Sequence, residues 1–345
     1  MRVAVVGATG YTGAELVRLL LGHPHVKIGA LVGHGKAGAP LSRAIPSLAG
    51  LVEGDVEPFD ADRVSERAEV VFCALPHGAS PPIVRALRAR GRTVFDLGAD
   101  LRLRDRAEHV RWYGPDEAAE LASQAVYGLV ELHADRIATA DLVAVPGCYP
   151  TASILALAPL LRERLVEPEG IVIDAKSGVS GAGRQPREST HFPEVGGGVR
   201  AYGVGGAHRH TPEIEQELSA LAGRTVRVTF TPHLLPMTRG ILASAYAVAR
   251  SGTTAAACTE AARALYRGSP TVVVLEPGGC PDTLHVRGSA RCMLSYTLDE
   301  RTGRLLAQAA IDNLLKGAAA QAVQCMNVRF GWPQATGLPL AACWP

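Results

Sequence analysis

The most constraining feature of this sequence is the passage from its first apolar run into its first helical pattern. Residues 2–6 read Arg-Val-Ala-Val-Val, largely β-branched and apolar, as a buried parallel strand requires. They continue into GATGYTG at 7–13, and helical periodicity follows over 14–21. A strand, a glycine-rich turn and a helix in this order predict a βαβ unit. The GxxGxxG spacing is a variant of the dinucleotide-binding fingerprint.

The three glycines of this turn have separate expected roles. Gly7 makes the tight turn, Gly10 lets the backbone approach a pyrophosphate, and Gly13 lets helix and strand pack closely. Backbone N–H groups at the helix start would hold the phosphates, although a purely structural turn is the alternative. The expected cofactor contacts are Gly7, Thr9, Gly10, Tyr11, Thr12 and Gly13.

The end of the second predicted strand, residues 28–32, bears on the choice of cofactor. An NAD site usually places Asp or Glu there, where the carboxylate binds the ribose 2′-hydroxyl. This chain instead continues Gly-His-Gly-Lys, with no acid. His34 and Lys36 could face a 2′-phosphate, which favours NADP(H). The alternative is that Lys36 is a solvated loop charge.

The rest of the chain follows two patterns, and 345 residues suit two domains. Before residue 100, strands at 69–74 and 93–97 flank a helix at 82–90, which predicts a parallel sheet. After Cys148, a helix at 149–165 precedes strand-rich segments, which predict an α+β second domain. These segments are 170–175, 225–231, 241–250, 272–275 and 290–298, with a glycine-rich loop at 178–206 and a long helix expected over 304–323.

Composition narrows the classes of partner. Lys and Arg number 35 and Asp and Glu 33, a net charge of +2, with no long basic run and 5% aromatic residues, which argues against nucleic-acid binding. No apolar stretch approaches the roughly 18 residues of a membrane span. The seven cysteines are scattered without a CxxC pair. That pattern argues against disulfides or structural zinc and favours a reducing cytoplasm.

One cysteine stands at a chemically special position. The segment Pro-Gly-Cys at 146–148 directly precedes an apolar helix. Cys148 would therefore lie at the positive end of a helix dipole, which favours the thiolate and makes a cysteine nucleophilic. The alternative is a structural cysteine that happens to begin a helix.

Two histidines, His208 and His210, bracket Arg209 before a Thr-Pro-Glu helix start at 211–213. A histidine near a nucleophilic cysteine could take its proton or donate one to an oxyanion. The His-x-His spacing could instead bind a metal, but no neighbouring cluster of Cys or carboxylates completes a ligand set, so no metal is expected. A capping role for one histidine is the structural alternative.

Two loops carry arginines suited to anions. Arg102 follows a predicted strand, and the carboxyl ends of strands face the ligand crevice in a doubly wound sheet. Its guanidinium could clamp an anionic group, or it could pair with Asp100 or Asp105. Arg184 ends a loop at 176–184 that is rich in hydroxyls and glycine, which suits a small anionic substrate.

Over nearly its whole length the chain resembles the N-acetyl-γ-glutamyl-phosphate reductases of arginine biosynthesis, which are related to aspartate-semialdehyde dehydrogenase. The resemblance implies an α/β fold with a Rossmann-type NADP-binding domain at 1–149 plus 312–345. It implies a glyceraldehyde-3-phosphate-dehydrogenase-like α+β domain at 150–311 for substrate and oligomerisation, and a homo-oligomer, dimer or tetramer. The matching segments are GATGYTGAEL, FCALPHG, DLGADLRL, PGCYPTA, KSGVSGAGR, YGVGGAHRHTPEIEQEL, FTPHLLPMTRGIL and DNLLKGAAAQAVQ.

The resemblance also implies a reaction. The Cys148 thiolate attacks the acyl phosphate of N-acetyl-γ-glutamyl phosphate, phosphate leaves, and hydride from NADPH reduces the thioester to the semialdehyde. His208 is expected in acid–base chemistry and His210 in substrate binding, although the sequence does not separate these two roles. Arg102 and Arg184 are expected to hold the phosphate or carboxylate. Ser177, Gly178 and Gln321 join the expected cofactor contacts.

Two residues of this chain depart from the family pattern. The chain has Val145 and Cys325 where the family usually has Asn, but neither change removes a nucleophile or an acid–base group.

Two other functions are possible interpretations of this sequence. The nearest rival is a reductase of carrier-protein-linked aminoadipyl or glutamyl phosphate in lysine biosynthesis, which a basic docking patch would distinguish. A non-catalytic NADP-sensing regulator would lack the cysteine and histidine segments.

Overall fold

The computed structural model describes residues 1–33, 37–52 and 54–343. The chain forms two compact units: unit 1 comprises Met1–Gly147 and Ala318–Leu338, and unit 2 comprises Cys148–Gly317 and Pro339–Pro345. These bounds differ from the expected ones in that Cys148, Tyr149, residues 312–317 and the C-terminal segment group with unit 2.

Backbone hydrogen bonds explain the placement of the C-terminal segment. The N–H of Ala290 donates to the carbonyl of Pro339 at 2.7 Å, and the N–H of Cys343 donates to the carbonyl of Arg287 at 2.8 Å. Arg287 and Ala290 lie just before β14 (Cys292–Asp299). The segment from Pro339 to Cys343 is therefore anchored to unit 2.

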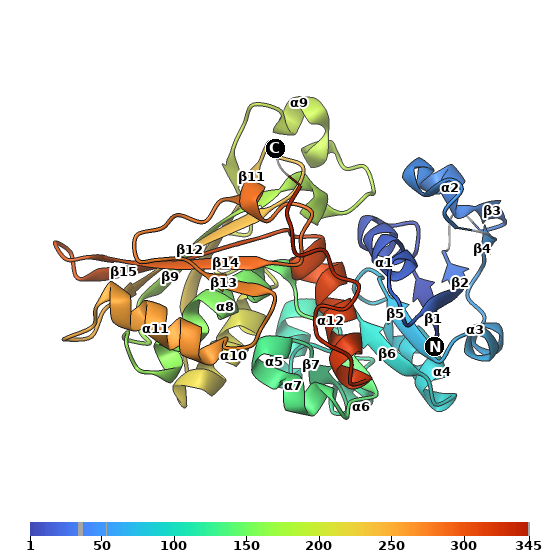
Figure 1. The fold of residues 1–345 in the computed structure, drawn as a ribbon, viewed down its shortest axis with the longest axis horizontal. Coiled ribbons are helices and arrows are strands. Elements are labelled where there is room, and N and C mark those ends of the chain that lie inside the picture. Colours follow the sequence, from blue (N-terminus) through green and yellow to red (C-terminus); the bar gives the residue numbers. More distant parts are fainter. Residues whose placement is uncertain (34–36, 53, 344–345) are drawn as a thin grey trace. The chain divides into compact units, whose positions relative to one another are not determined.

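Unit 1 contains a six-stranded sheet in the order β2-β1-β5-β6-β8-β7 (Figure 1). Every neighbouring pair is parallel, as the alternation of strands and helices predicts. A separate two-stranded ribbon joins β3 (Ala39–Pro40) and β4 (Asp55–Val56). The strands of the main sheet are β1 (Arg2–Val6), β2 (Lys27–Val32), β5 (Val70–Cys73), β6 (Thr93–Asp96), β7 (Val126–Tyr127) and β8 (Leu142–Ala144).

Helices pack on this sheet in two groups. The helix α1 (Tyr11–Leu21) packs on β1 and β2 and contacts α12 (Ala320–Arg329), which also meets β6 and α7 (Val130–Ile137). In the other group, α3 (Ala61–Arg67) and α4 (Pro81–Ala89) contact each other, β1 and β6. The remaining helices are α2 (Leu41–Ala44), α5 (Arg106–Tyr113) and α6 (Ala119–Ala122), with a 3-10 turn at Pro46–Leu48.

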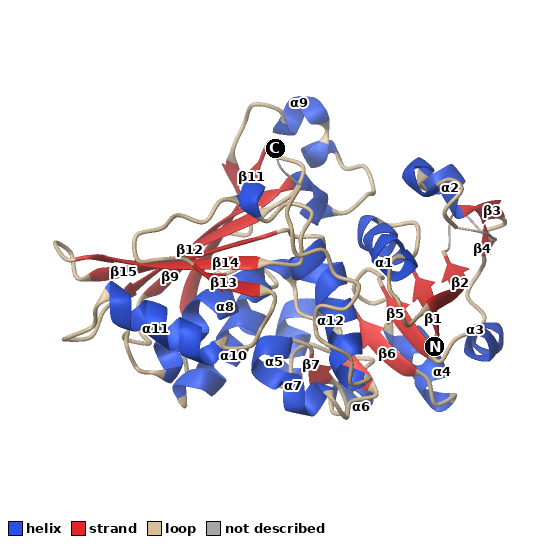
Figure 2. Ribbon diagram, in the orientation of Figure 1, coloured by secondary structure: helices blue, strands red, loops and turns tan. Residues whose placement is uncertain are grey.

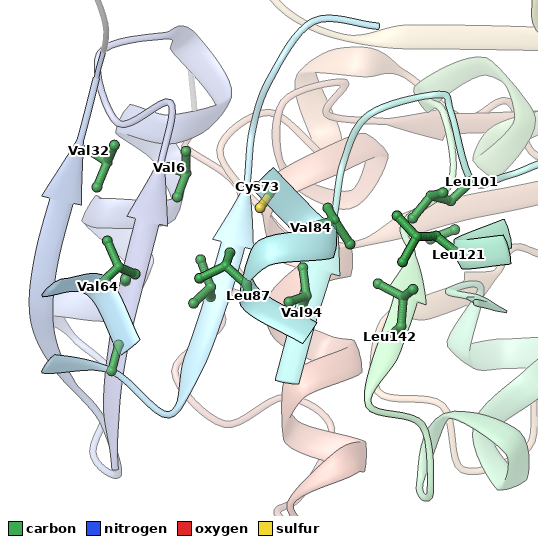
Figure 3. Close-up of a cluster of buried hydrophobic side chains, with 14 of the residues drawn as sticks. Val6, Val32, Val64, Cys73, Val84, Leu87, Val94, Leu101, Leu121 and Leu142 are labelled. Carbon is green, nitrogen blue, oxygen red and sulfur yellow. The ribbon is translucent and has the colours of Figure 1, made fainter. Parts of the chain in front are cut away.

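Figure 3 shows the apolar layer between the sheet and the helices α3 and α4. Alternate residues of a strand point to opposite faces, so Val6 enters this layer while its neighbour Val5 does not. Val64 of α3 and Leu87 of α4 complete the layer. This packing fixes the carboxyl ends of the parallel strands, where the nucleotide turn begins.

Unit 2 contains a seven-stranded mixed sheet in the order β10-β11-β9-β12-β15-β14-β13 (Figure 2). Its strand-rich pattern after Cys148 was expected, and the α/β fold class with an α+β second unit is confirmed. The strands are β9 (Ile171–Gly178), β10 (Arg200–Ala201), β11 (Val228–Leu235), β12 (Ile241–Val248), β13 (Val272–Val274), β14 (Cys292–Asp299) and β15 (Arg304–Ile311).

Helices of unit 2 cover one face of this sheet. The helix α8 (Cys148–Arg162) packs on β12, β14 and β15, α10 (Thr211–Ala222) packs on β11, and α11 (Ala255–Leu265) packs on β13 and β14 (Figure 2). On the opposite face Val172 and Tyr246 are cross-strand partners and are 36% and 39% exposed. The sheet thus carries a face that these helices leave uncovered.

The prediction of a long helix over 304–323 is wrong for its first half. Residues 304–311 form β15, which pairs with β12 and β14, and a π-helical turn at Leu315–Ala319 precedes α12. Leu305, Ala307 and Ala309 are buried and alternate with more exposed residues. Burial at every second residue is typical of a strand, not of a helix.

The predicted glycine-rich loop at 178–206 contains short elements. They are α9 (Phe192–Val195), β10, and 3-10 turns at Val179–Ala182 and Glu188–Thr190. A further 3-10 turn at Thr283–His285 precedes β14. The 178–206 segment is therefore folded over part of its length.

Candidate active site

The turn between β1 and α1 requires glycine at two positions. Gly7 has a φ of +87°, and a β-carbon added there would lie 2.2 Å from the carbonyl oxygen of Ala74. A β-carbon at Gly13 would lie 2.1 Å from the carbonyl oxygen of Gly7. At Gly10 the nearest atom would be 3.5 Å away. The chain's own packing thus requires glycine at positions 7 and 13, whereas a β-carbon at Gly10 would make only an ordinary van der Waals contact.

The start of α1 is suited to an anion. Gly10 is its N-cap, no side chain caps the helix, and its first turn has no acidic residue. The positive end of the helix dipole is therefore not neutralised by the chain's own carboxylates. Tyr11 is 40% exposed at this end, and Thr9 packs against Gly33 at the end of β2. His34 and Lys36, the residues predicted to select NADP(H), lie outside the described residues.

Arg102 closes the loop that follows β6. It is 8% exposed, and its Nη2 donates to the carbonyl oxygen of Leu97 at 2.8 Å. Asp100 pairs with Nδ1 of His77 at 2.9 Å, and Asp105 caps α5 through its side chain. Arg102 is thus a buried cation at the carboxyl end of the parallel sheet, within unit 1.

Asp96, the last residue of β6, was not singled out from the sequence. It is fully buried, accepting from Ser80 Oγ at 3.0 Å and from the N–H of Gly98 at 3.1 Å. Burial raises its pKa to about 6, and the positive charge of Arg102 acts in the opposite direction. Its place at a strand end, beginning the segment DLGAD, is the signal that could have found it.

The two family departures both fall on buried positions. Val145 is fully buried, and its N–H donates to the carbonyl of Asp96 at 2.8 Å. Cys325 is also buried, and its Sγ donates to the carbonyl of Gly128 at 3.1 Å. Gln321, on the same helix α12, donates from Nε2 to that carbonyl at 2.8 Å. Its buried Oε1 has no hydrogen-bond partner among the described residues.

Cys148 is the first residue of α8, one position before the predicted helix start, and is partly exposed. The first turn of α8 carries no acid, so the positive helix end is available to a thiolate. Of the other six cysteines, Cys280 and Cys343 are exposed. The buried ones are Cys73, Cys258, Cys292 and Cys325.

A pair of tyrosines lies beside Cys148. The hydroxyls of Tyr149 and Tyr202 are 2.9 Å apart. Burial raises the pKa of Tyr202 to about 12, and a charge on Cys148 contributes to the increase. Burial likewise raises the pKa of Tyr149, which also responds to Cys148. Neither tyrosine is among the site residues predicted from the sequence, although Tyr149 directly follows the cysteine.

His208 stands in an aromatic setting next to this pair. Its ring lies edge-on to Tyr149, Tyr202 and Phe230, with centroids 5.6, 5.5 and 5.2 Å away. Its Nδ1 accepts the N–H of His210 at 3.1 Å. Burial lowers the pKa of His208 to about 4, and the charge of Arg209 acts in the same direction.

His210 joins the same group of rings. It is the N-cap residue of α10, and its ring centroid lies 5.0 Å from that of His208 and 6.0 Å from that of Tyr149. Unit 2 therefore brings both predicted histidines to the tyrosine that follows Cys148.

The end of β9 and the loop that follows it hold the other predicted residues of unit 2. Ser177 is 2% exposed, and its Oγ donates to the carbonyl of Gly178 at 3.0 Å. A β-carbon added at Gly178 would lie 2.8 Å from the backbone of Met237 and Arg239, so a glycine is needed there. Arg184 lies farther along the loop and is exposed.

The described residues form neither a metal-binding cluster nor a membrane-spanning helix. Among residues 1–33, 37–52 and 54–343, no group of three or more His, Cys, Asp or Glu side chains could hold a metal ion. Nor does any helix in these ranges have the length and apolar character needed to cross a membrane.

Known proteins with this architecture place the chain in a class. Residues 2–140 match the family model of the semialdehyde dehydrogenase NAD binding domain, and residues 148–313 match that of the semialdehyde dehydrogenase dimerisation domain. The fold resembles a probable aspartate-semialdehyde dehydrogenase from Pseudomonas aeruginosa, with a TM-score of 0.71, 20% identity, and coverage of 96% of this chain and 98% of that one. The protein is thus of the semialdehyde dehydrogenase class.

Full-length relatives narrow the class to one family. The chain is 50% identical over 346 residues to the N-acetyl-γ-glutamyl-phosphate reductase of Desulforudis audaxviator, and 48% identical over 345 residues to that of Geotalea daltonii. Both matches cover 100% of each chain. The chain belongs to the N-acetyl-γ-glutamyl-phosphate reductase family.

Proposed function

We propose that this protein reduces N-acetyl-γ-glutamyl phosphate to N-acetylglutamate 5-semialdehyde with NADPH, in the cytoplasm, as a step of arginine biosynthesis. The observation that carries the proposal is Cys148 at the start of α8, beside the Tyr149–Tyr202 pair. Full-length relatives named for this reductase support the substrate over its carrier-linked counterpart. Cysteines without disulfides suit a reducing compartment.

The first half of the reaction belongs to Cys148. Its thiolate attacks the acyl carbon, a C–S bond forms, the bond from carbon to the phosphate oxygen breaks, and phosphate leaves after taking up a proton from solvent. The result is a thioester on Sγ. The positive end of α8 favours the thiolate before attack and again when it departs as the leaving group.

The second half places charge on the former carbonyl oxygen. NADPH, when bound, supplies a hydride to the acyl carbon. His208 is proposed to donate a hydrogen bond from Nε2 to the resulting oxyanion, because its Nδ1 already accepts the N–H of His210. Collapse of the thiohemiacetal breaks the C–S bond and releases the aldehyde and the Cys148 thiolate. His210, Arg184 and Arg102 are proposed to bind the substrate's anionic groups.

The chain's own residues fit a dinucleotide. The turn at 7–13 offers the phosphates the uncapped start of α1 and the backbone at Gly10, which has no side chain to block their approach. Gln321 is proposed to use its buried Oε1 to accept from a carboxamide N–H of the cofactor. Ser177 and Gly178, which is pinned against Met237 and Arg239, are further proposed contacts.

A second copy of the chain is the proposed partner of the uncovered sheet face. Val172, Tyr246 and Val248 on this face are 36%, 39% and 37% exposed. Asp174, Lys176 and His233 form a polar cluster on it, with Lys176 Nζ and His233 Nδ1 lying 2.9 and 3.1 Å from Asp174 Oδ1. Residues 148–313 match the family model of a dimerisation domain, which supports a dimer, and the uncovered face is the surface proposed for it.

The decisive experiment is the reaction run in reverse. N-acetylglutamate semialdehyde, NADP⁺ and phosphate are mixed with the protein, and NADPH absorbance is followed. The proposal expects formation of NADPH that requires both aldehyde and phosphate, and is much slower with NAD⁺. Absence of phosphate-dependent NADPH formation would reject the activity, and equal rates with NAD⁺ would reject the cofactor. A preparation carrying Cys148→Ala serves as the blank.

A further inference from the structure

The backbone of Gly317 lies directly against the base of the Cys148 side chain. A β-carbon added at Gly317 would be 2.7 Å from Cβ of Cys148 and 3.2 Å from its Cα. On another side it would be 3.2 Å from Cδ1 of Ile311. The first distance is shorter than contacts between real side-chain carbons, so only glycine allows this approach. Cβ of Cys148 cannot swing aside as the tip of a long side chain would.

Gly317 belongs to the π-helical turn Leu315–Ala319, an uncommon form that often occurs at functional sites. Asp312, fully buried, fixes the start of this turn: its Oδ1 accepts the N–H groups of Leu314 and Leu315 at 2.9 and 3.1 Å. Its carbonyl accepts the N–H of Gly317 at 3.0 Å. The backbone that meets Cys148 is therefore held by one buried carboxylate residue.

Asp312 is itself tied to the rest of unit 2. Its Oδ2 accepts the N–H of Gly288 at 2.8 Å and lies 3.6 Å from Nη1 of Arg239. Next to it, Asn313 is 2% exposed, accepts the N–H of Gly240 at 2.8 Å and donates to Ser180 Oγ at 3.0 Å. These contacts anchor the turn to three other segments of unit 2, at Gly288, at 239–240 and at Ser180, so it is held from several sides.

Lys316 adds a further anchor immediately before the glycine. Its side chain is fully buried, and its Nζ donates to Thr271 Oγ1 at 3.3 Å. Burying a lysine is costly, so the segment is specified by more than apolar packing. Within this run of anchored side chains, the one residue without a side chain is the one that faces Cys148.

We propose that Gly317 is a positioning residue for Cys148, and that the Leu315–Ala319 turn is the support that holds the nucleophile's Cβ in place. The proposal rests on the proposed role of Cys148 as nucleophile. A methyl group at 317 must displace either the turn or Cys148, and a misplacement of about 1 Å can cost about 100-fold in rate. The effect should fall on the chemistry and not on substrate binding.

The kinetic test compares Gly317→Ala with Gly22→Ala. Gly22 ends α1 in unit 1, and a β-carbon there would meet nothing nearer than 3.8 Å, so the same chemical change is made without a clash. We expect kcat of Gly317→Ala to fall by about 10–100-fold with KM changed by less than about threefold, and Gly22→Ala to match wild type. Unchanged kcat in Gly317→Ala would overturn the proposal.

A second readout needs no substrate. Iodoacetamide labelling across pH, followed by peptide mass spectrometry, gives separate rates for Cys148 and for the exposed Cys280 in the same tube. Gly317→Ala should shift the rate or the pH profile at Cys148 and leave Cys280 unchanged. If wild type has no reductase activity, the proposed function fails, yet this comparison still decides the positioning role. Identical Cys148 profiles in variant and wild type would refute it.

A double-mutant cycle covers the case in which Gly317→Ala folds poorly. Cys148→Gly removes the β-carbon that the added methyl would meet, so the stability loss from Gly317→Ala should shrink in the Cys148→Gly background. Recovery of a folded, more heat-resistant double variant supports the proposal. Equal losses in both backgrounds, or failure of both to fold, would place the clash elsewhere and overturn it.

Discussion

The backbone N–H of His210 donates to Nδ1 of His208 across 3.1 Å. A neutral imidazole carries a hydrogen on only one of its two ring nitrogens. Because Nδ1 accepts this bond, the N–H hydrogen of His208 lies on Nε2. Burial lowers the pKa of His208 to about 4, so the ring is neutral near pH 7. His208 is thus prepared to donate a hydrogen bond from Nε2, which suits stabilisation of an oxyanion better than removal of a proton.

The first prediction concerns acid stability. The pKa of His208 falls from 6.5 to about 4 on folding, so the unfolded chain takes up the proton first as the pH drops. His208 therefore costs stability progressively from about pH 6.5 down to about pH 4. Urea unfolding at pH 7 and pH 4.5 should show a smaller loss in His208→Gln than in wild type. The exposed His191→Gln is the control, and an equal pH dependence in all three proteins would contradict the pKa assignment.

The second prediction separates His208 from the nucleophile. His208→Asn removes the proposed oxyanion donor but leaves Cys148, so kcat should fall by about 10²–10³-fold. Acylation should still occur. Mass spectrometry after mixing the variant with the acyl phosphate, without NADPH, should detect an adduct on Cys148. A variant with normal kcat would remove His208 from the mechanism.

The third prediction concerns Cys148. Cys148→Ser should abolish reduction, because a serine hydroxyl remains protonated near neutral pH, whereas a thiol at a helix start loses its proton far more readily. NADPH affinity should stay within about twofold, since the phosphates are expected to rest on 7–13 in another part of the chain. Cys280→Ser is the matched control, and turnover in Cys148→Ser or an adduct on a different cysteine would end the assignment.

The fourth prediction tests the uncovered sheet face. Tyr246→Glu places a charge beside Val172 in the middle of this face, which would be buried unpaired in a dimer. Sedimentation velocity should show a shift from dimer to monomer. Leu51→Glu changes a residue that is 63% exposed in unit 1 and should leave the assembly unchanged. A dimer that persists in Tyr246→Glu would exclude this face as the interface.

Local patterns allowed the sequence to predict most of the parallel sheet. β1, the glycine turn and α1 are adjacent in sequence, so their order reveals the βαβ unit. The sequence predicts a helix over residues 304–311 because Ala and Leu are compatible with both helical and strand periodicity. Pairing with β12 and β14 makes this segment a strand. The contact between Cys148 and Gly317 could not be predicted, because it joins distant segments through a turn whose form depends on the buried Asp312.

The last prediction separates the two roles of glycine in the nucleotide turn. Gly13→Ala should destabilise unit 1 by about 3 kcal/mol, because the added β-carbon would lie 2.1 Å from the carbonyl oxygen of Gly7. Gly10→Ala should fold with nearly normal stability, since its β-carbon would meet nothing nearer than 3.5 Å and its φ of −80° suits alanine. Yet that methyl group would occupy the space proposed for the pyrophosphate. Thermal unfolding should therefore show a loss of stability in Gly13→Ala and nearly none in Gly10→Ala. NADPH titration should show binding to Gly10→Ala that is at least about tenfold weaker than to wild type. Normal NADPH affinity in Gly10→Ala would mean that the cofactor's phosphates do not rest on this turn.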